Sequence, residues 1–135
     1  MTDEEARKRF AAARVARLAT TDGDGNPHLV PICFAIEDGT IYSAVDAKPK
    51  TTPDLKRLRN IEHNPRVTLL VDHYEEEWTH VWWVRVDGTA SVHDTHERGR
   101  AALASKYEQY TDTLLGRVVV IRPTKWTSWA YADPV

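Results

Sequence analysis

The sequence predicts a mainly β fold, a small antiparallel barrel whose ends are covered by helices. Six or seven segments have the composition of β-strands and three short segments have that of helices. These segments do not alternate regularly, which argues against a doubly wound α/β sheet. The chain has 135 residues, a length typical of one domain, and we identify no repeat or linker in it. We therefore expect a single barrel domain over residues 1–135.

The first third of the chain predicts one helix followed by three strands. Thr2 and Glu5 match a capping box, which opens a short helix rich in Ala and Arg. Turn residues fill 22–27 and 37–39, a pattern typical of two consecutive hairpins. Pro31 lies inside the second strand, and because proline lacks an N–H group we expect a sheet edge or a bulge there. The helix is expected at 3–13, and a three-stranded meander at 14–21, 28–36 and 40–45.

The remainder of the chain predicts two further helices and four strands. Thr52 and Pro53 match the N-cap and the first position of a helix. Leu55, Leu58 and Ile61 give that helix a single apolar stripe. The helices are expected at 52–64 and, capped by Asp94, at 94–107; the strands are expected at 66–72, 79–93 with a bend at 87–88, 116–122 and, after Pro123, 124–132.

Basic residues are concentrated in one window of a chain that is close to neutral overall. The chain has 18 Lys and Arg against 20 Asp and Glu, a formal net charge of −2. Residues 48–66 contain six basic and two acidic side chains, so this window carries +4 and the remainder −6. A nucleic-acid-binding domain is normally basic as a whole, whereas a confined basic patch suits a small anionic ligand. A solvated helix face is the alternative interpretation.

The composition predicts a cytoplasmic protein that does not bind membranes. Cys33 is the single cysteine, which excludes an internal disulfide framework and suits a reducing compartment. The acidic N-terminal residues have the wrong charge for a secretory signal. The longest apolar stretch, Leu29–Ile36, is much shorter than the ~20 residues of a membrane-spanning helix.

Three possible chemical motifs are weak. Asp22, Asp24 and Asn26 match the opening of a calcium loop, but proline and cysteine occupy later key positions, so we expect a hairpin turn. His93 and His96 lack further ligands at zinc spacing, so we expect helix-cap or surface roles and no metal. The lone cysteine lies in an apolar run, where a thiol behaves as a small hydrophobe, and no catalytic residue is assigned.

Five tryptophans, Trp78, Trp82, Trp83, Trp126 and Trp129, are a large number for this length. Trp82 and Trp83 are adjacent on a predicted strand, so their rings must point to opposite faces. Aromatic side chains on an outer face indicate an oligomer interface or a stacking surface for a planar ligand. Simple packing in the core is the alternative.

One loop leads directly into a predicted helix N-terminus and is suited to bind an anion. The loop contains Lys48, Lys50, Thr51 and Thr52. Backbone N–H groups at a helix start, together with hydroxyl and ammonium groups, favour phosphate. Arg57 lies one and a half turns into the helix and is placed to reach the same anion. These features predict a ligand that carries a phosphate, and the tryptophans indicate that it is planar.

The order of these segments resembles the flavin and deazaflavin oxidoreductases with a split β-barrel, the pyridoxamine-phosphate-oxidase-like superfamily. The resemblance is carried by residues 15–31, 41–45, 48–72 and 86–90. The run from Trp78 to Gly88 and the Arg122–Trp126 segment are most similar to an actinobacterial-type branch that uses coenzyme F420.

The resemblance implies a Greek-key split β-barrel of the FMN-binding type and a homodimer whose two cofactor sites lie in grooves at the subunit interface. The cofactor phosphate would be held by the loop and helix after the third strand, and the ring would lie along the second strand. An aromatic side chain would come from the partner subunit. The matching positions are Lys48, Lys50, Thr51, Arg57 and Asn60 for the phosphate, Val30, Pro31 and Ile32 for the ring, and Trp78 for the aromatic residue.

The second strand carries Pro31, Ile32 and Cys33 where FMN-binding oxidases have polar or basic residues, which favours a deazaflavin. The implied function is F420-dependent hydride transfer between the coenzyme and a small organic substrate. An FMN-dependent oxidase or reductase of the same fold is one alternative. A non-catalytic flavin or haem-type binding module is the other.

Overall fold

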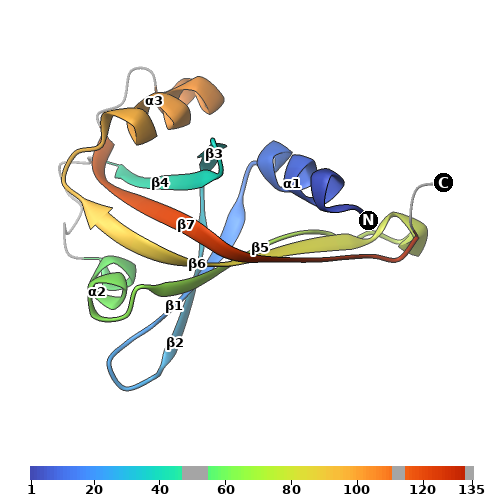
Figure 1. Ribbon diagram of the computed structural model, residues 1–135, viewed down its shortest axis with the longest axis horizontal. Coiled ribbons are helices and arrows are strands. Elements are labelled where there is room, and N and C mark those ends of the chain that lie inside the picture. Colours follow the sequence, from blue (N-terminus) through green and yellow to red (C-terminus); the bar gives the residue numbers. More distant parts are fainter. Residues whose placement is uncertain (47–54, 111–114, 133–135) are drawn as a thin grey trace.

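A computed structural model describes residues 1–46, 55–110 and 115–132, and in these residues seven strands form one antiparallel sheet (Figure 1). The strands are β1 (Ala16–Thr21), β2 (Pro27–Ile32), β3 (Ala35–Glu37), β4 (Thr40–Asp46), β5 (Arg66–His73), β6 (Trp82–His93) and β7 (Leu115–Ala130). The helices of the described residues are α1 (Asp3–Ala12), α2 (Lys56–His63) and α3 (Glu97–Lys106), with 3₁₀ turns at Trp78–His80 and Glu108–Tyr110. The predicted mainly β split barrel is confirmed.

The sheet curls into a barrel because β2 and β3 lie at its opposite edges. The strand order is β2-β1-β5-β6-β7-β4-β3, yet only Cys33 and Phe34 separate β2 from β3 along the chain. Three peptide steps reach about 11 Å at most, so the two edges must meet at this point. In the described residues β2 and β3 are not paired by backbone hydrogen bonds, so the barrel is split between these two strands.

The predicted continuous strand over 28–36, and with it the three-stranded meander, is therefore wrong. The hydroxyl of Tyr107 accepts a hydrogen bond from the Phe34 N–H group at 3.0 Å and lies 2.8 Å from both the Phe34 and the Arg14 carbonyl oxygens. Phe34 thus finds its partners on a side chain 73 residues away instead of in a sheet ladder, and the strand divides at this residue. The predicted edge position of Pro31 is confirmed on β2.

The predicted break at Pro123 is also wrong, because β7 runs through this residue without interruption. Pro123 faces Gly88, where the β6–β7 register shifts after Asp87, so the missing N–H group of proline falls at a bulge. Thr124 Oγ1 donates to the Asp87 carbonyl at 3.0 Å, and a Cβ atom on Gly88 would lie 2.6 Å from the Arg122 carbonyl oxygen. The predicted bend at 87–88 is this bulge.

Two helices begin later than the sequence predicts. The described part of α2 begins at Lys56, and the Leu55 carbonyl accepts its first hydrogen bonds; Thr52 and Pro53 lie outside the described residues. In α3 the N-cap is His96 and not Asp94, because His96 Nδ1 accepts from the Gly99 N–H group at 3.0 Å. The capping box of α1 is confirmed, since the Thr2 hydroxyl accepts from the Glu5 N–H group.

The core is built mainly between the sheet, α1 and α2, with a second cluster under α3. Phe10 of α1 is fully buried, with its ring centroid 4.8 Å from that of Phe34 and 5.3 Å from that of Trp126. Leu58 and Ile61 of α2 enter the same core, as the predicted apolar stripe requires. The described residues contain no helix that is long and apolar enough to cross a membrane.

Lys106 connects the C-terminal ends of α3 and α1. Its ammonium donates to the Ala13 carbonyl at 2.6 Å and lies 3.9 Å from the Phe34 ring centroid. Burial first, and the charge of Arg14 second, lower the pKa of Lys106 to about 8.

Because of this lowered pKa of Lys106, we expect the free energy of unfolding to rise as the pH rises above 8. Between pH 8 and 9.5 the unfolded chain keeps the lysine proton that the folded chain loses, so the free energy of unfolding rises with pH. Because the ammonium is only about half buried, solvent screening reduces the expected gain to about 1 kcal/mol. Denaturant titrations at both pH values should show this rise in the wild type and not in Lys106→Met. If the free energy of unfolding rises equally with pH in the two proteins, Lys106 is not the cause of the rise.

Candidate functional site

The structure describes six of the nine residues predicted to bind a cofactor. Val30, Pro31 and Ile32 lie on β2, Arg57 and Asn60 lie on α2, and Trp78 lies in the 3₁₀ turn before β6. Lys48, Lys50 and Thr51 lie outside the described residues, so their predicted part in a phosphate site stays a prediction.

Asn60 joins α2 to the sheet. Its side chain is 3% exposed, and its Nδ2 donates to Thr20 Oγ1 of β1 at 3.1 Å. One turn later, Asn64 Nδ2 donates to Thr21 Oγ1 at 2.9 Å. These two side-chain hydrogen bonds fix the orientation of α2 about its own axis. The same helix carries Arg57, which is half-buried. Within the described residues, Asn60 therefore positions the helix.

The β2 residues lie at an edge of the described sheet. Val30 pairs with Leu18 of β1, and Pro31 pairs with Arg17. Ile32 is buried and Val30 packs against the core, whereas the Pro31 side chain is exposed. An edge strand presents backbone groups that its own sheet does not use, so a planar ligand along β2 would find both hydrogen-bonding groups and the proline ring.

Trp78 lies far from Arg57 and Asn60, the predicted residues on α2. The helix α2 precedes the first residue of β5, and Trp78 follows its last residue, so the eight-residue strand separates them. At about 3.3 Å per residue this strand is roughly 23 Å long. One chain therefore brings Arg57 and Asn60 together but does not bring Trp78 to them. The side chain of Trp78 is 67% exposed.

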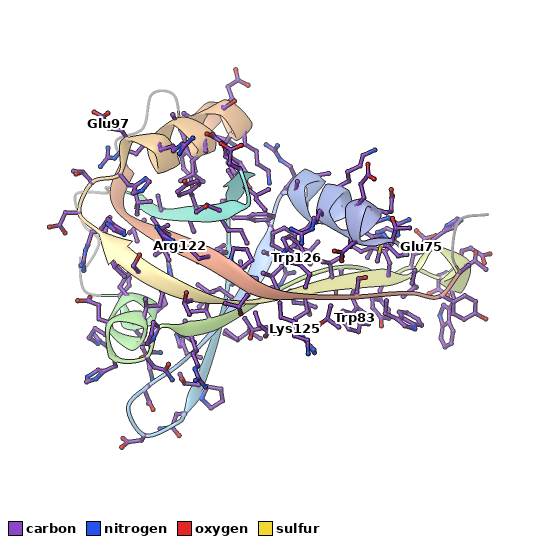
Figure 2. All side chains as sticks on the ribbon, in the orientation of Figure 1. Glu75, Trp83, Glu97, Arg122, Lys125 and Trp126 are labelled. Carbon is purple, nitrogen blue, oxygen red and sulfur yellow. The ribbon has the colours of Figure 1, made fainter. Side chains whose placement is uncertain are left out.

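The long β5-β6-β7 ribbon has one face covered by α1 and one open face (Figure 2). Trp126 points toward α1, where it contacts Phe10 and the guanidinium of Arg7, whereas Trp83 and Lys125 point away from it. The predicted opposite orientation of Trp82 and Trp83 is confirmed, since Trp82 packs against the core. Core packing thus holds for Trp82 and Trp126, whereas the predicted role of outer-face tryptophans in an interface or a stacking surface stays a prediction.

The open face contains two adjoining grooves that share Ala19 and Thr68. The groove beside α2 has a volume of about 700 Å³ and is rich in hydroxyl groups. Thr68 Oγ1 donates to Asp87 Oδ1 at 2.7 Å on its floor, and Arg66 and Asn64 form its border with α2.

The second groove lies toward the other end of β5 and is more apolar, with a volume of about 430 Å³. It is lined by Leu29, Leu70, Tyr74 and Trp83, together with Arg17, Arg85 and Asp72. Leu29 is 66% exposed and Tyr74 is 67% exposed. Arg85 Nε and Thr127 Oγ1, on paired residues of β6 and β7, are buried atoms without a hydrogen-bond partner in the described chain.

Sequence reasoning missed the residues of this second groove. Arg17, Leu29 and Arg85 lie in segments that carry the family resemblance, but the resemblance assigns no role to them; their signal is the period-two alternation that places them on the same face as Trp83. That alternation was available in the sequence, but the strand order that joins the segments was not.

The two ends of the open face have opposite charges. At the α2 end, Lys56 and Arg59 are exposed and Arg66 borders the polar groove. We define the hairpin tip as residues 73–81, at the opposite end of β5, where Glu75, Glu76 and Glu77 follow one another. The described basic residues of the 48–66 window therefore lie at one end of the ribbon.

The remaining motifs do not form a metal site in the described residues. Asp22 Oδ1 accepts from the N–H groups of Asp24 and Asn26, both at 2.9 Å, in the hairpin turn that the sequence predicts. The rings of His93 and His96 are 5.4 Å apart, and His96 caps α3. In 1–46, 55–110 and 115–132, no group of three or more His, Cys, Asp or Glu side chains is arranged to hold a metal ion.

Solved structures of similar fold include proteins of different kinds. A conserved hypothetical protein, Rv2991, from Mycobacterium tuberculosis has 23% sequence identity, with 96% of this chain and 85% of that chain covered and a TM-score of 0.75. An FAD-binding protein from Mycobacterium smegmatis has 22% identity, 97% of both chains covered and a TM-score of 0.67. The heme storage protein HutZ from Vibrio cholerae has 16% identity, with 95% and 93% covered and a TM-score of 0.69.

These identities establish the common fold and not a common ligand. No curated protein matches the sequence significantly. A family model does: the one described as pyridoxamine 5'-phosphate oxidase matches residues 2–130, nearly the whole chain. With the split barrel, the edge strand β2 and the open ribbon face described above, this match shows that the chain belongs to the pyridoxamine 5'-phosphate oxidase family.

Proposed function

We propose that the protein is a homodimeric oxidoreductase that binds coenzyme F420 between its subunits and transfers a hydride to or from a small organic substrate. The observation that carries this proposal is the separation of Arg57 and Trp78 at opposite ends of the open face. The family match supports a flavin-type cofactor. The apolar Pro31-Ile32 stretch on β2 favours a deazaflavin.

The open face is suited to a second copy of the chain. Leu29 and Tyr74 expose large side chains on this face, which an interface would cover. Thr127 Oγ1 has no hydrogen-bond partner in the described residues, and Arg85 Nε has only the ion pair with Asp87 Oδ2 at 3.9 Å. A two-fold axis that lies in the plane of this face and crosses the ribbon at right angles would place each end of the ribbon on the far end of the partner's ribbon. The acidic hairpin tip of one subunit would then lie on the basic α2 end of the other. Opposite charges would meet twice in such a dimer.

The same two-fold arrangement completes a cofactor site. The phosphate would be held by Arg57, with the loop residues Lys48 and Lys50, and the ring would lie along Val30–Ile32. Trp78 of the partner subunit would cover the ring and exclude water. A bound F420 supplies the hydride chemistry itself, and the protein residues bind and orient it. The described site residues offer no side chain to which we assign proton transfer.

Arg57→Ala is expected to weaken binding of F420 by about 1.5–3 kcal/mol, since one charge-assisted bond to phosphate would be lost. Titration of the cofactor fluorescence measures this change. Arg98→Ala is the matched control, because Arg98 is exposed on α3 and pairs with Glu37 and Asp38. If Arg57→Ala binds F420 as tightly as the control does, the basic window is a solvated helix face and not a phosphate site.

FMN is the second candidate cofactor, favoured by the similarity to FAD-binding proteins. Parallel titrations with F420 and FMN separate the two, and tighter binding of FMN would overturn our choice of coenzyme. A haem-type or storage role is tested by turnover. If the bound, reduced cofactor passes its hydride to no acceptor in a screen of enones, quinones and biliverdin, the protein is not the oxidoreductase that we propose.

A further inference from the structure

The hairpin tip that carries Trp78 is held by one carboxylate between two imidazoles. His73, the last residue of β5, donates from Nε2 to Glu75 Oε2 at 2.5 Å. His80, the last residue of the 3₁₀ turn, donates from Nδ1 to the other oxygen, Glu75 Oε1. We propose that these three residues, which we call the clamp, set the position of Trp78 and make it depend on pH between 5 and 8.

The clamp is joined to the rest of the ribbon by its two ends. The His73 ring stacks on Trp82, its partner in the β5–β6 ladder, with 22° between the planes. His80 belongs to the same 3₁₀ turn as Trp78, and the Val81 N–H group donates to the Trp78 carbonyl at 3.0 Å. The Val81 carbonyl in turn accepts from the Tyr131 N–H group at 2.9 Å. A shift of His80 relative to His73 therefore moves the turn that presents Trp78.

The charged groups around the clamp come from several elements. Arg9 of α1 lies over the Trp82 ring at 5.3 Å, and its Nε donates to Glu5 Oε1 at 3.1 Å. Asp72 precedes His73, and Glu76 and Glu77 follow Glu75 along the chain. Thr79 Oγ1 donates to Glu77 Oε1 at 2.8 Å, which engages that carboxylate in capping the turn. The clamp residues and Arg9 line a small groove of their own, and Ala130 of β7 and Ala132 just after it line the same groove without adding charge.

Histidine is the side chain that normally changes its charge between pH 5 and 8. The pKa of Glu75 is held below its ordinary value, by the hydrogen bond from His73 first and by that from His80 second. Glu75 therefore stays ionised between pH 5 and 8. Protonated imidazoles make charge-assisted bonds to this carboxylate, and neutral ones make weaker bonds. The clamp that we propose therefore tightens when its imidazoles are protonated and loosens when they are neutral.

The consequence for the cofactor rests on the proposed function, because it requires Trp78 to cover a ring bound by the partner subunit. In that setting Glu75 is a positioning residue. A looser tip at pH 8 would cover the ring less well, so the cofactor dissociation constant would rise with pH. The clamp itself does not depend on the identity of the cofactor.

The test follows the indole N–H resonance of Trp78 in the full-length protein without cofactor, assigned by its loss in Trp78→Phe. We expect this resonance to shift between pH 5 and 8 in the wild type and to shift clearly less in Glu75→Gln. Glu76→Gln, one residue along the same exposed loop, is the matched control and should behave as the wild type. A pH-independent Trp78 resonance in the wild type, or the same shift in Glu75→Gln, would overturn the clamp.

A second measurement separates failure of the clamp from failure of the proposed function. The dissociation constant of F420 is expected to rise about three- to tenfold more between pH 5.5 and 8 in the wild type than in Glu75→Gln. The comparison with the variant removes any titration of the coenzyme itself. Suppose that the Trp78 resonance shifts with pH as expected while the F420 affinity changes equally in the wild type and in Glu75→Gln. That result would support the clamp and overturn the proposed cofactor site shared by the two subunits.

Discussion

Leu29→Glu is expected to convert the proposed dimer into folded monomers. Leu29 is largely exposed on β2 and lines the apolar groove, so the substitution should not disturb the fold of one chain. In the proposed two-fold interface it would bring two carboxylates, one from each subunit, into a desolvated surface. We expect the dimer dissociation constant to rise at least about 100-fold, about 2.7 kcal/mol, and cofactor binding to fall with it.

Sedimentation and light scattering across a concentration series measure this change, with circular dichroism to show that the fold is retained. Val15→Glu is the matched control, because Val15 is also an exposed apolar residue but lines a different groove, beside the end of α1. The control should stay dimeric. A Leu29→Glu protein with the same oligomeric state as the control would show that the open face is not the interface.

Phe10→Ala is expected to lower the free energy of unfolding by about 3–5 kcal/mol. Phe10 is fully buried, and its ring lies against both Phe34, at the split in the barrel, and Trp126 of β7. Removing the ring leaves a cavity where α1 meets both edges of the barrel. Denaturant unfolding at one fixed protein concentration measures the loss, because dimer stability depends on concentration.

Phe10→Leu keeps much of the apolar volume and serves as the control, with a clearly smaller loss. If Phe10→Ala costs less than about 1 kcal/mol, the packing of α1 described above does not contribute to the stability of the barrel.

Local patterns predicted those parts of the fold that depend on neighbouring residues. The capping box at Thr2, the apolar stripe of α2 and the opposite faces of Trp82 and Trp83 all follow from spacing along one element. The division of the second strand does not, because it depends on the hydroxyl of Tyr107, 73 residues away. Likewise, Pro123 is tolerated because β7 bulges at Thr124, opposite Gly88 of another strand.

The candidate site was predictable to a smaller extent. The residue types around α2 predict an anion site, but only the strand order shows that β5 separates Arg57 from Trp78. The clamp on Glu75 joins residues two and five positions apart, yet three polar residues around a hairpin tip carry no recognisable pattern. Its geometry is visible only once β5 and β6 are paired.

The composite site is tested most directly by a mixed dimer of Arg57→Ala and Trp78→Ala subunits, purified with two different tags. Each variant alone is expected to bind F420 weakly. In the mixed dimer one site combines both substitutions, while the other receives an intact Arg57 from one subunit and an intact Trp78 from its partner. We predict one site per mixed dimer with wild-type affinity, half the wild-type stoichiometry. A mixed dimer without any such site would show that Arg57 and Trp78 do not meet across the interface.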